Sequence, residues 1–178
     1  MSLAERSRRR PAARTGAGRY VAPGVLCILR HRDAVLLIEG ARRKRWAGKL
    51  QGIGGGVQPG ENPVRAALRE IREETGLQLS ADDVQMKGVV HSQRFYGESK
   101  LMIVVVARAP HRRVRGGDEG TLRWVPLRAL SRAPNLIPDL YTLIPRVLSL
   151  RPGELLSGVA VYDGKGGMVS LELTSVKS

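Results

Sequence analysis

Seven residues suited to phosphate chemistry stand at fixed intervals between Gly55 and Leu77, in the segment GGVQPGENPVRAALREIREETGL. They follow the pattern G-x5-E-x7-R-E-U-x-E-E-x-G-U, where U is apolar, with fixed positions filled by Gly55, Glu61, Arg69, Glu70, Glu73, Glu74 and Gly76. At ordinary residue frequencies such a match arises by chance on the order of once in 10^8 starting points. Because Mg2+ prefers oxygen ligands and commonly joins carboxylates to substrate phosphates, the spacing favours metal-assisted chemistry on a phosphorylated substrate.

One helix is expected to position the glutamates. Asn62 can accept an unpaired backbone N–H at the start of a helix, and Pro63 fits the first helical position. Gly76 supplies a left-handed end. An apolar stripe for the core is expected at Val64, Ala67, Leu68 and Ile71.

Three carboxylates then share one side of this helix, those of Glu70, Glu73 and Glu74, while Arg65, Arg69 and Arg72 fall on another. Such clustering costs a few tenths of a kcal/mol per like-charged pair. A divalent cation would compensate this repulsion. The alternative for a bare REIREE run is a solvated helix face, and the matched spacing of Gly55, Glu61 and Gly76 argues against it.

The pattern resembles the Nudix box, and the chain is identified by it as similar to the Nudix hydrolases. The resemblance implies an α/β fold, an α/β/α sandwich with a mixed β-sheet between helices. It also implies hydrolysis of phosphoric anhydrides in nucleotides with Mg2+ or Mn2+. Carried over from the family, Glu70, Glu73 and Glu74 are metal ligands or, for one of them, the base that activates water. Arg69 and Glu61 would form a supporting ion pair, and the Gly55 carbonyl would be a further ligand. Many relatives carry Lys where Gly56 stands, so that charge is absent or supplied elsewhere.

Outside the box the chain resembles the MutT-type enzymes that remove oxidised purine nucleoside triphosphates, over most of residues 20–176. The matching segments are AGKLQGIGGGVQPGE, SKLMIVVVAR, DEGTLRWVPLRAL and GVAVYDGKGGMVSLELTSV. The resemblance places Glu119 as a further carboxylate near the metal; the alternatives are Asp118 in that role, or a loop charge at Glu119 with no metal contact.

The positions that read the base agree less well with this group. Gln51 stands where the eukaryotic branch has Asn, and Asp139 matches one acidic base-reading residue. Leu140 replaces a second acidic residue, and Ile137 replaces an aromatic stacking partner. Selectivity for oxidised purines therefore stays open.

Other residues have two open interpretations. His91, Phe95, Tyr96 and Met102 either line the nucleoside pocket or pack within the fold. The basic segment ARRKRWAGK, residues 41–49, either contacts polyphosphate, with Arg45 and Lys49 as binding candidates, or forms a solvated loop.

The pattern of apolar runs predicts the elements around the box helix. Strands are expected at residues 20–29, 34–38, 84–91, 101–107, 122–125, 158–162 and 168–173, and a second helix at 139–150. The GIGGGVQPGE segment is expected to be a glycine-rich turn. The order suggests a mixed sheet with helices on both faces.

Length and composition indicate one domain over residues 20–178 after a basic, disordered arm at 1–19, which carries six Arg against one Glu. This arm could contact nucleic acid, although a solvated tail is the preferred interpretation. No apolar run is long enough for a signal sequence or membrane span. Cys27 has no intramolecular partner, which favours the cytoplasm. The oligomeric state, monomer or homodimer, stays open.

The net charge of +14 suits an anionic substrate. The expected function is a metal-dependent nucleotide pyrophosphohydrolase that converts a (deoxy)nucleoside triphosphate to the monophosphate and pyrophosphate. The alternatives are a Nudix hydrolase acting on dinucleoside polyphosphates, nucleotide sugars or capped RNA, and a non-catalytic nucleotide-sensing module.

Overall fold

The computed structural model describes residues 21–177, which form a mixed nine-stranded sheet. The strands are β1 (Ala22–His31), β2 (Ala34–Gly40), β3 (Leu50–Gln51), β4 (Ile53–Gly56), β5 (Val84–Phe95), β6 (Glu98–Arg108), β7 (Gly120–Pro126), β8 (Glu154–Tyr162) and β9 (Met168–Lys177). Their main order is β3-β2-β1-β6-β5-β8-β9, with β4 paired to β1 and β7 paired to β2. The expected arm at 1–19 and Tyr20 lie outside the described residues.

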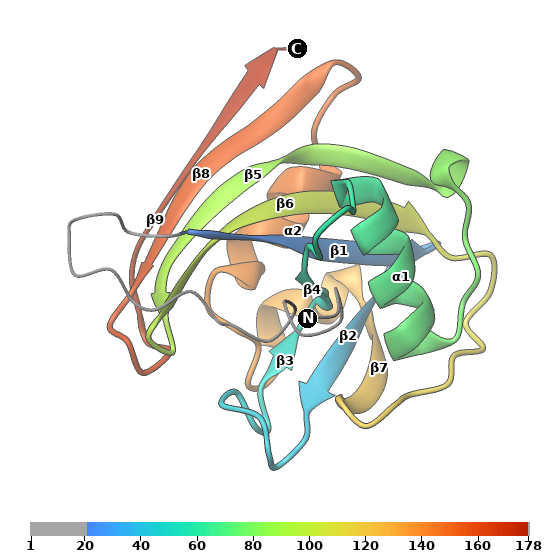
Figure 1. Cartoon of the computed structure of the whole chain (residues 1–178), viewed down its shortest axis with the longest axis horizontal. Coiled ribbons are helices and arrows are strands. Elements are labelled where there is room, and N and C mark those ends of the chain that lie inside the picture. Colours follow the sequence, from blue (N-terminus) through green and yellow to red (C-terminus); the bar gives the residue numbers. More distant parts are fainter. Residues whose placement is uncertain (1–20, 178) are drawn as a thin grey trace, which may run out of the picture.

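Helices cover both faces of the sheet, which confirms the expected α/β class (Figure 1). The helix α1 (Pro63–Thr75) packs on one face, and α2 (Leu140–Leu148) packs on the other together with the 3-10 turn η3 (Leu127–Arg132). A second 3-10 turn, η2 (Ala81–Asp83), precedes β5. Among the described residues, no helix combines the length and the hydropathy required to cross a bilayer.

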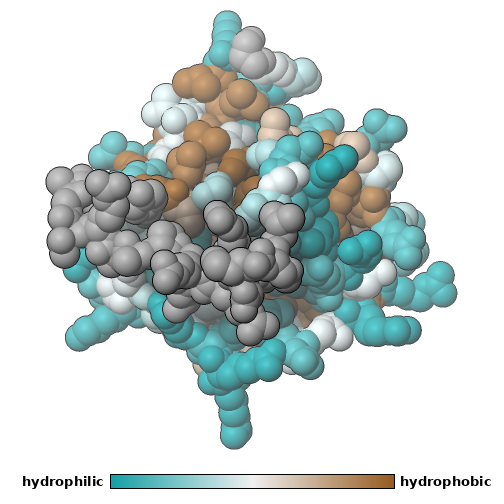
Figure 2. Space-filling view, viewed as in Figure 1, coloured by the Kyte–Doolittle hydropathy of each residue, from teal (hydrophilic) through white to brown (hydrophobic). Residues whose placement is uncertain are grey.

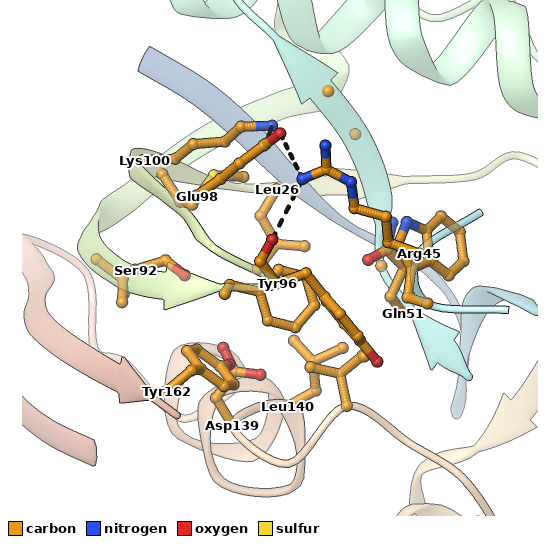
Figure 3. Close-up of a pocket in the computed structure, with 18 of the residues that line it drawn as sticks. Leu26, Arg45, Gln51, Ser92, Tyr96, Glu98, Lys100, Asp139, Leu140 and Tyr162 are labelled. Atoms are coloured by element: carbon orange, nitrogen blue, oxygen red, sulfur yellow. Dashed lines mark hydrogen bonds and ion pairs between the residues drawn. The ribbon is translucent and has the colours of Figure 1, made fainter. Parts of the chain in front are cut away.

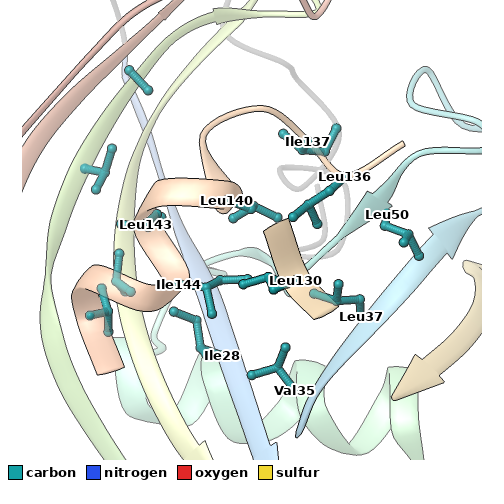
Figure 4. Close-up of a cluster of buried hydrophobic side chains, with 14 of the residues drawn as sticks. Ile28, Val35, Leu37, Leu50, Leu130, Leu136, Ile137, Leu140, Leu143 and Ile144 are labelled. Carbon is teal, nitrogen blue, oxygen red and sulfur yellow. The ribbon is translucent and has the colours of Figure 1, made fainter. Parts of the chain in front are cut away.

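The apolar runs of the central strands are continuous because both of their faces are buried. In β1, Cys27 and Leu29 point toward the cluster under α1, whereas Ile28 joins the cluster under α2. The cluster under α2 brings Leu130, Ile137, Leu140 and Ile144 onto Ile28, Val35 and Leu37 (Figure 4). The chain thus has two apolar layers separated by one sheet.

The ends of α1 follow the local sequence. The Asn62 side chain accepts the backbone N–H of Arg65 at 2.9 Å, and Pro63 is the first helical residue. Gly76 ends the helix in the left-handed region, at φ 73°. The expected apolar stripe is confirmed, because Ala67 and Ile71 are buried in the core and Val64 and Leu68 pack half-buried against the same cluster. Ala66 is buried in this cluster as well.

The glycine-rich segment before α1 differs from the expected turn, because it begins with the short strand β4, directly after β3. Strand β4 pairs antiparallel with the first half of β1, along the same edge that β2 uses further on. A Cβ at Gly54, whose φ is 147°, would lie 2.1 Å from the Val25 carbonyl oxygen. Glycine is therefore required at position 54, where β4 pairs with β1.

The other strands extend beyond their expected ends. Strand β5 continues to Phe95 and strand β6 begins at Glu98, so that Tyr96 and Gly97 form the tip of a long hairpin.

Hydrophilic side chains cover much of the surface in Figure 2, in keeping with the net charge of +14. Three exposed apolar side chains, Met168, Val169 and Val176, belong to the edge strand β9.

Candidate active site

The junction of α1 with β4 holds a buried carboxylate. Glu74 is 6% exposed, and its Oε2 accepts the backbone N–H of Gly54 at 3.0 Å. The pKa of Glu74 is raised to about 8, mainly by burial and to a smaller extent by the nearby carboxylates of Glu70 and Glu119. The Gly54 N–H and the Lys44 ammonium oppose this rise. A carboxylate in these surroundings is suited to a cationic partner, which would stabilise its ionised form.

Glu70 lies directly against the glycines of β4. A Cβ built at Gly55 would stand 2.3 Å from Glu70 Oε1, so no larger residue fits while this carboxylate keeps its place. The neighbouring Gly56 has no such contact within 4 Å. Glycine is therefore needed at position 55, and not at position 56, because a side chain at position 55 would displace the Glu70 carboxylate.

Arg69 connects the carboxylates of α1 to the chain that precedes it. Its Nε and Nη2 donate to the two oxygens of Glu61 at 2.7 and 3.0 Å. Its Nη1 donates to Glu70 at 2.7 Å and to Glu73 at 3.3 Å, and Nη2 also reaches the Gly56 carbonyl at 2.9 Å. The hydrogen bonds from Arg69 lower the pKa of Glu61 to about 2. This fork fixes the start of α1 against β4.

The three helix glutamates have different surroundings. Glu74 turns toward the core, Glu70 lies between Arg69 and Gly55, and the Glu73 side chain is 53% exposed. Arg69 reaches across to Glu70 and Glu73 because its side chain is long, so the basic residues are not confined to another face. Within residues 21–177, no three His, Cys, Asp or Glu side chains are already gathered as a metal cage.

The donors at this junction nevertheless fit a hard divalent cation. Glu70 and Glu74 supply oxygens one helical turn apart, beside a glycine edge that leaves room for a ligand. Glu119 acts electrostatically on Glu74 and forms an ion pair with Lys44. The same cation would stabilise the ionised form of Glu74, whose pKa is raised by burial and by these neighbouring carboxylates.

A cavity of about 340 Å³ opens beside this junction (Figure 3). This volume is within the range of small-molecule sites, roughly 300–1,000 Å³. One end of the cavity is formed by Gly54 and Gly55. The other end is formed mainly by apolar and aromatic side chains, among them Phe95, Ile137, Leu140 and Tyr162.

Asp139 is the buried acid at the apolar end. It is 8% exposed and stands just before α2, facing Tyr162 in Figure 3. Tyr162 hydrogen-bonds to the Asp139 carboxyl, but Asp139 Oδ1 has no partner among the described residues. Burial raises the pKa of Asp139 to about 6, against the lowering effect of the Tyr162 hydrogen bond. One buried oxygen is thus left for a ligand.

Charged side chains lie at the mouth of the cavity. Arg45 Nη1 donates to the Tyr96 carbonyl at 3.2 Å and to Glu98 Oε1 at 3.0 Å, and Lys100 Nζ lies 3.3 Å from Glu98 Oε2 (Figure 3). These contacts join the loop after β2 to the tip of the β5–β6 hairpin. Both segments therefore border the opening of the cavity.

The cavity collects most of the residues expected to bind substrate. Those that line it are Gln51, Asp139, Arg45, Ile137 and Leu140, together with Phe95, Tyr96 and Met102. Lys49 is exposed and does not line the cavity, and its expected contact with polyphosphate stays a prediction. Its side chain follows the turn around Gly48, whose φ of 69° redirects the chain into β3. His91 is also outside the lining, and its Nδ1 contacts Gln93 at 3.2 Å.

Tyr162 and Ser92 line the cavity although the sequence did not single them out. Tyr162 ends an apolar strand immediately before the turn DGKGG, which is the one signal that could have found it. Ser92 carries no comparable signal. Its place depends on the parallel pairing of β5 with β8, where Ser92 is opposite Ala160.

The family model of the NUDIX domain matches residues 19–147. With the glutamate helix seated against a glycine strand beside a small-molecule cavity, the chain belongs to the Nudix family. Its fold is that of MutT-type proteins. The crystal structure of the MutT protein from Bacillus halodurans matches with a TM-score of 0.72 at 23% identity, over 86% of this chain and 97% of that one.

Two relatives show how far the sequence likeness extends. An uncharacterised Nudix hydrolase of Bacillus subtilis, YvcI, is 28% identical over 152 residues, which cover 83% of this chain and 90% of the relative. The oxidised purine nucleoside triphosphate hydrolase of Danio rerio is 44% identical over 63 residues, which cover 35% of this chain and 38% of that protein.

Proposed function

We propose that this Nudix protein is a metal-dependent nucleotide pyrophosphohydrolase that converts a nucleoside triphosphate to the monophosphate and pyrophosphate. The observation that carries the proposal is the shape of one cavity. It joins the glycine edge beside the α1 carboxylates to an apolar end with a buried acid, Asp139. A nucleotide has the same division into a polyanionic part and a flat, hydrogen-bonding base.

At the polar end, Glu70, Glu73 and Glu74 would hold Mg2+ or Mn2+, with Glu119 and the Gly55 carbonyl as further oxygens. Such an ion neutralises phosphate charge and lowers the pKa of bound water. One of these glutamates would accept the proton of the attacking water, whose oxygen would bond to phosphorus as the phosphoanhydride bond between monophosphate and pyrophosphate breaks. The Gly54 N–H orients Glu74, which accepts this hydrogen bond at 3.0 Å.

Arg69 and Glu61 would act one step away from the reacting atoms. Their two hydrogen bonds, at 2.7 and 3.0 Å, hold the guanidinium that contacts Glu70 and Glu73. Charge-assisted, bidentate contacts of this kind restrict orientation more than single contacts do. The pair therefore sets where two of the proposed ligands point.

At the apolar end, Asp139 Oδ1 and the Gln51 amide would read the base edge, while Ile137 and Leu140 pack against its face. The local identity to the Danio rerio oxidised purine nucleoside triphosphate hydrolase supports a purine as the base.

The buried Cys27, whose thiol pKa is raised by burial, suits a reducing compartment, and we place the enzyme in the cytoplasm.

A hydrolysis panel tests the proposed reaction. Normal and oxidised purine nucleoside triphosphates, pyrimidine triphosphates, nucleotide sugars, dinucleoside polyphosphates and capped RNA are offered with Mg2+ and with Mn2+, and products are separated by anion exchange. Monophosphate and pyrophosphate should form fastest from a purine triphosphate. Preferential cleavage of a nucleotide sugar, a dinucleoside polyphosphate or capped RNA would exclude the triphosphate class. Absence of hydrolysis with every substrate and both metals would indicate a binding module.

Asp139→Asn is expected to separate base recognition from stability. Because burial raises the pKa of Asp139 from 3.8 to about 6, the folded state binds more protons than the unfolded state in that interval. The free energy of unfolding of the wild type should fall on this account as pH rises from about 4 to about 6, by on the order of 2 kcal/mol. The variant should lack this component of the pH dependence.

Thermal unfolding of both proteins at pH 4.5 and 7.5 measures the difference, and Asp139→Asn should gain Tm relative to wild type at the higher pH. KM for the preferred nucleotide should rise about 10- to 100-fold at pH 7.5, since a buried hydrogen-bonding group no longer matches the base. Asp82→Asn, in the exposed turn η2 and outside the lining of the cavity, is the control. An unchanged KM with Asp139→Asn would remove the base-reading role.

A further inference from the structure

Lys44 lies between the proposed metal site and the cavity. Its Nζ forms an ion pair with the Glu119 carboxylate, and its side chain is 26% exposed. The same side chain lines the cavity together with Gly54 and Gly55. Lys44 therefore touches both an acidic residue beside Glu74 and the space that a ligand would occupy.

Backbone contacts fix the loop that carries Lys44. The N–H of Lys44 donates to the Ala41 carbonyl at 2.9 Å, and the N–H of Ala41 donates to the Glu119 carbonyl at 3.0 Å. Arg43 Nη2 adds a hydrogen bond to the Asp118 carbonyl at 2.9 Å. The loop after β2 and the segment before β7 are thus joined on both sides of the Lys44–Glu119 pair, which holds the pair beside α1.

The other cations near the cavity are differently engaged. Arg69 contacts the carboxylates of Glu61, Glu70 and Glu73. Arg45 and Lys100 both pair with Glu98 at the mouth. Of the four basic side chains that line the cavity, Lys44 is the one whose ion pair involves a proposed metal ligand, Glu119.

We propose that Lys44 is a counter-charge that changes partner, pairing with Glu119 in the absence of a divalent cation and with substrate phosphate once that cation occupies the Glu119 carboxylate. The inference rests on the proposed function, because it assumes that metal and phosphate meet at this site. A lysine suits the role, since its ammonium is a point charge on a flexible stem and needs no fixed approach angle. The glycines of β4 supply no side-chain cation here.

Lys44→Met tests both proposed partners of Lys44, because the variant should bind Mn2+ more tightly and polyphosphate more weakly than wild type. Without nucleotide, Mn2+ should bind about two- to fivefold more tightly, the range that release of a partly exposed ion pair supplies. With Mn2+ saturating, inorganic tripolyphosphate should bind at least about fivefold more weakly, because its cationic partner is gone. Calorimetric titration of the full chain measures both affinities without turnover.

Arg42→Met is the matched control. Arg42 is exposed in the same loop and does not line the cavity, so the variant loses the same charge two residues away. Both of its affinities should stay within about twofold of wild type. Lys44→Arg keeps the charge and should retain most of the tripolyphosphate affinity.

Two results would overturn the proposal. One is unchanged or weaker Mn2+ binding by Lys44→Met, which would show that the ammonium does not compete with metal for Glu119. The other is equal weakening of tripolyphosphate binding by Arg42→Met and Lys44→Met, which would reveal a general effect of charge. If wild type hydrolyses no nucleotide but the opposite changes are found, the proposed reaction fails while the exchange of partners stands.

Discussion

Glu74→Gln is expected to lower kcat by roughly 10²- to 10⁴-fold while leaving the fold intact, the range that loss of a positioned acid or base produces. The amide oxygen of Gln can still accept the Gly54 N–H, which now donates to Glu74 at 3.0 Å. What the variant loses is the negative charge beside Glu70. Steady-state hydrolysis and thermal unfolding, measured on the same preparations, test the two halves of this expectation.

The stability of Glu74→Gln should equal or exceed that of wild type, because ionising a carboxyl that is 6% exposed carries a desolvation penalty.

Glu73→Gln should lower kcat by a factor similar to that expected for Glu74→Gln. Glu172→Gln, on the exposed side of β9, is the control and should leave both Tm and kcat unchanged. Near wild-type hydrolysis by both helix variants would remove the proposed mechanism.

Gly55→Ala should reduce kcat/KM by on the order of 10²-fold, the loss that a displacement of about 1 Å in a catalytic group can cause. The added Cβ would stand 2.3 Å from Glu70 Oε1 and must push this carboxylate aside. Since the obstacle is the end of a flexible side chain, the strand itself should keep its place. Tm is expected to change little, and metal titration should show weaker binding.

Gly56→Ala is the neighbouring control, because nothing lies within 4 Å of a Cβ at that position. It adds the same methyl group to the same strand and should retain most of the activity. Equal losses in the two alanine variants would mean that β4 tolerates no side chain for reasons unrelated to Glu70. Unfolding of Gly55→Ala would lead to the same conclusion.

The sequence predicted features that depend on neighbouring residues along the chain. Asn62 and Gly76 marked the ends of α1 because capping and left-handed turns are set within a few residues. The apolar runs of β1 and β2 were recognisable because both sheet faces are buried. The α/β class followed from the family resemblance and from the order of these elements.

Features that depend on distant pairing were missed or misplaced. Strands β3 and β4 have too few residues to show a period of two, and β4 exists because β1 offers it an edge. Tyr162 reaches Asp139 only because β8 pairs with β5 next to α2. Lys49 looked equivalent to Lys44 in a basic run, yet the turn at Gly48 leaves one exposed and the other in the cavity.

The division of the molecule by its sheet has a consequence for the way specificity can diverge. Ile137 and Leu140 belong to the apolar layer under α2, whereas α1 and its carboxylates pack on the opposite layer. Substitutions in separate layers with no shared partners tend to add independently. A descendant of this chain could therefore acquire a new base preference through the α2 layer and inherit its reaction chemistry unchanged.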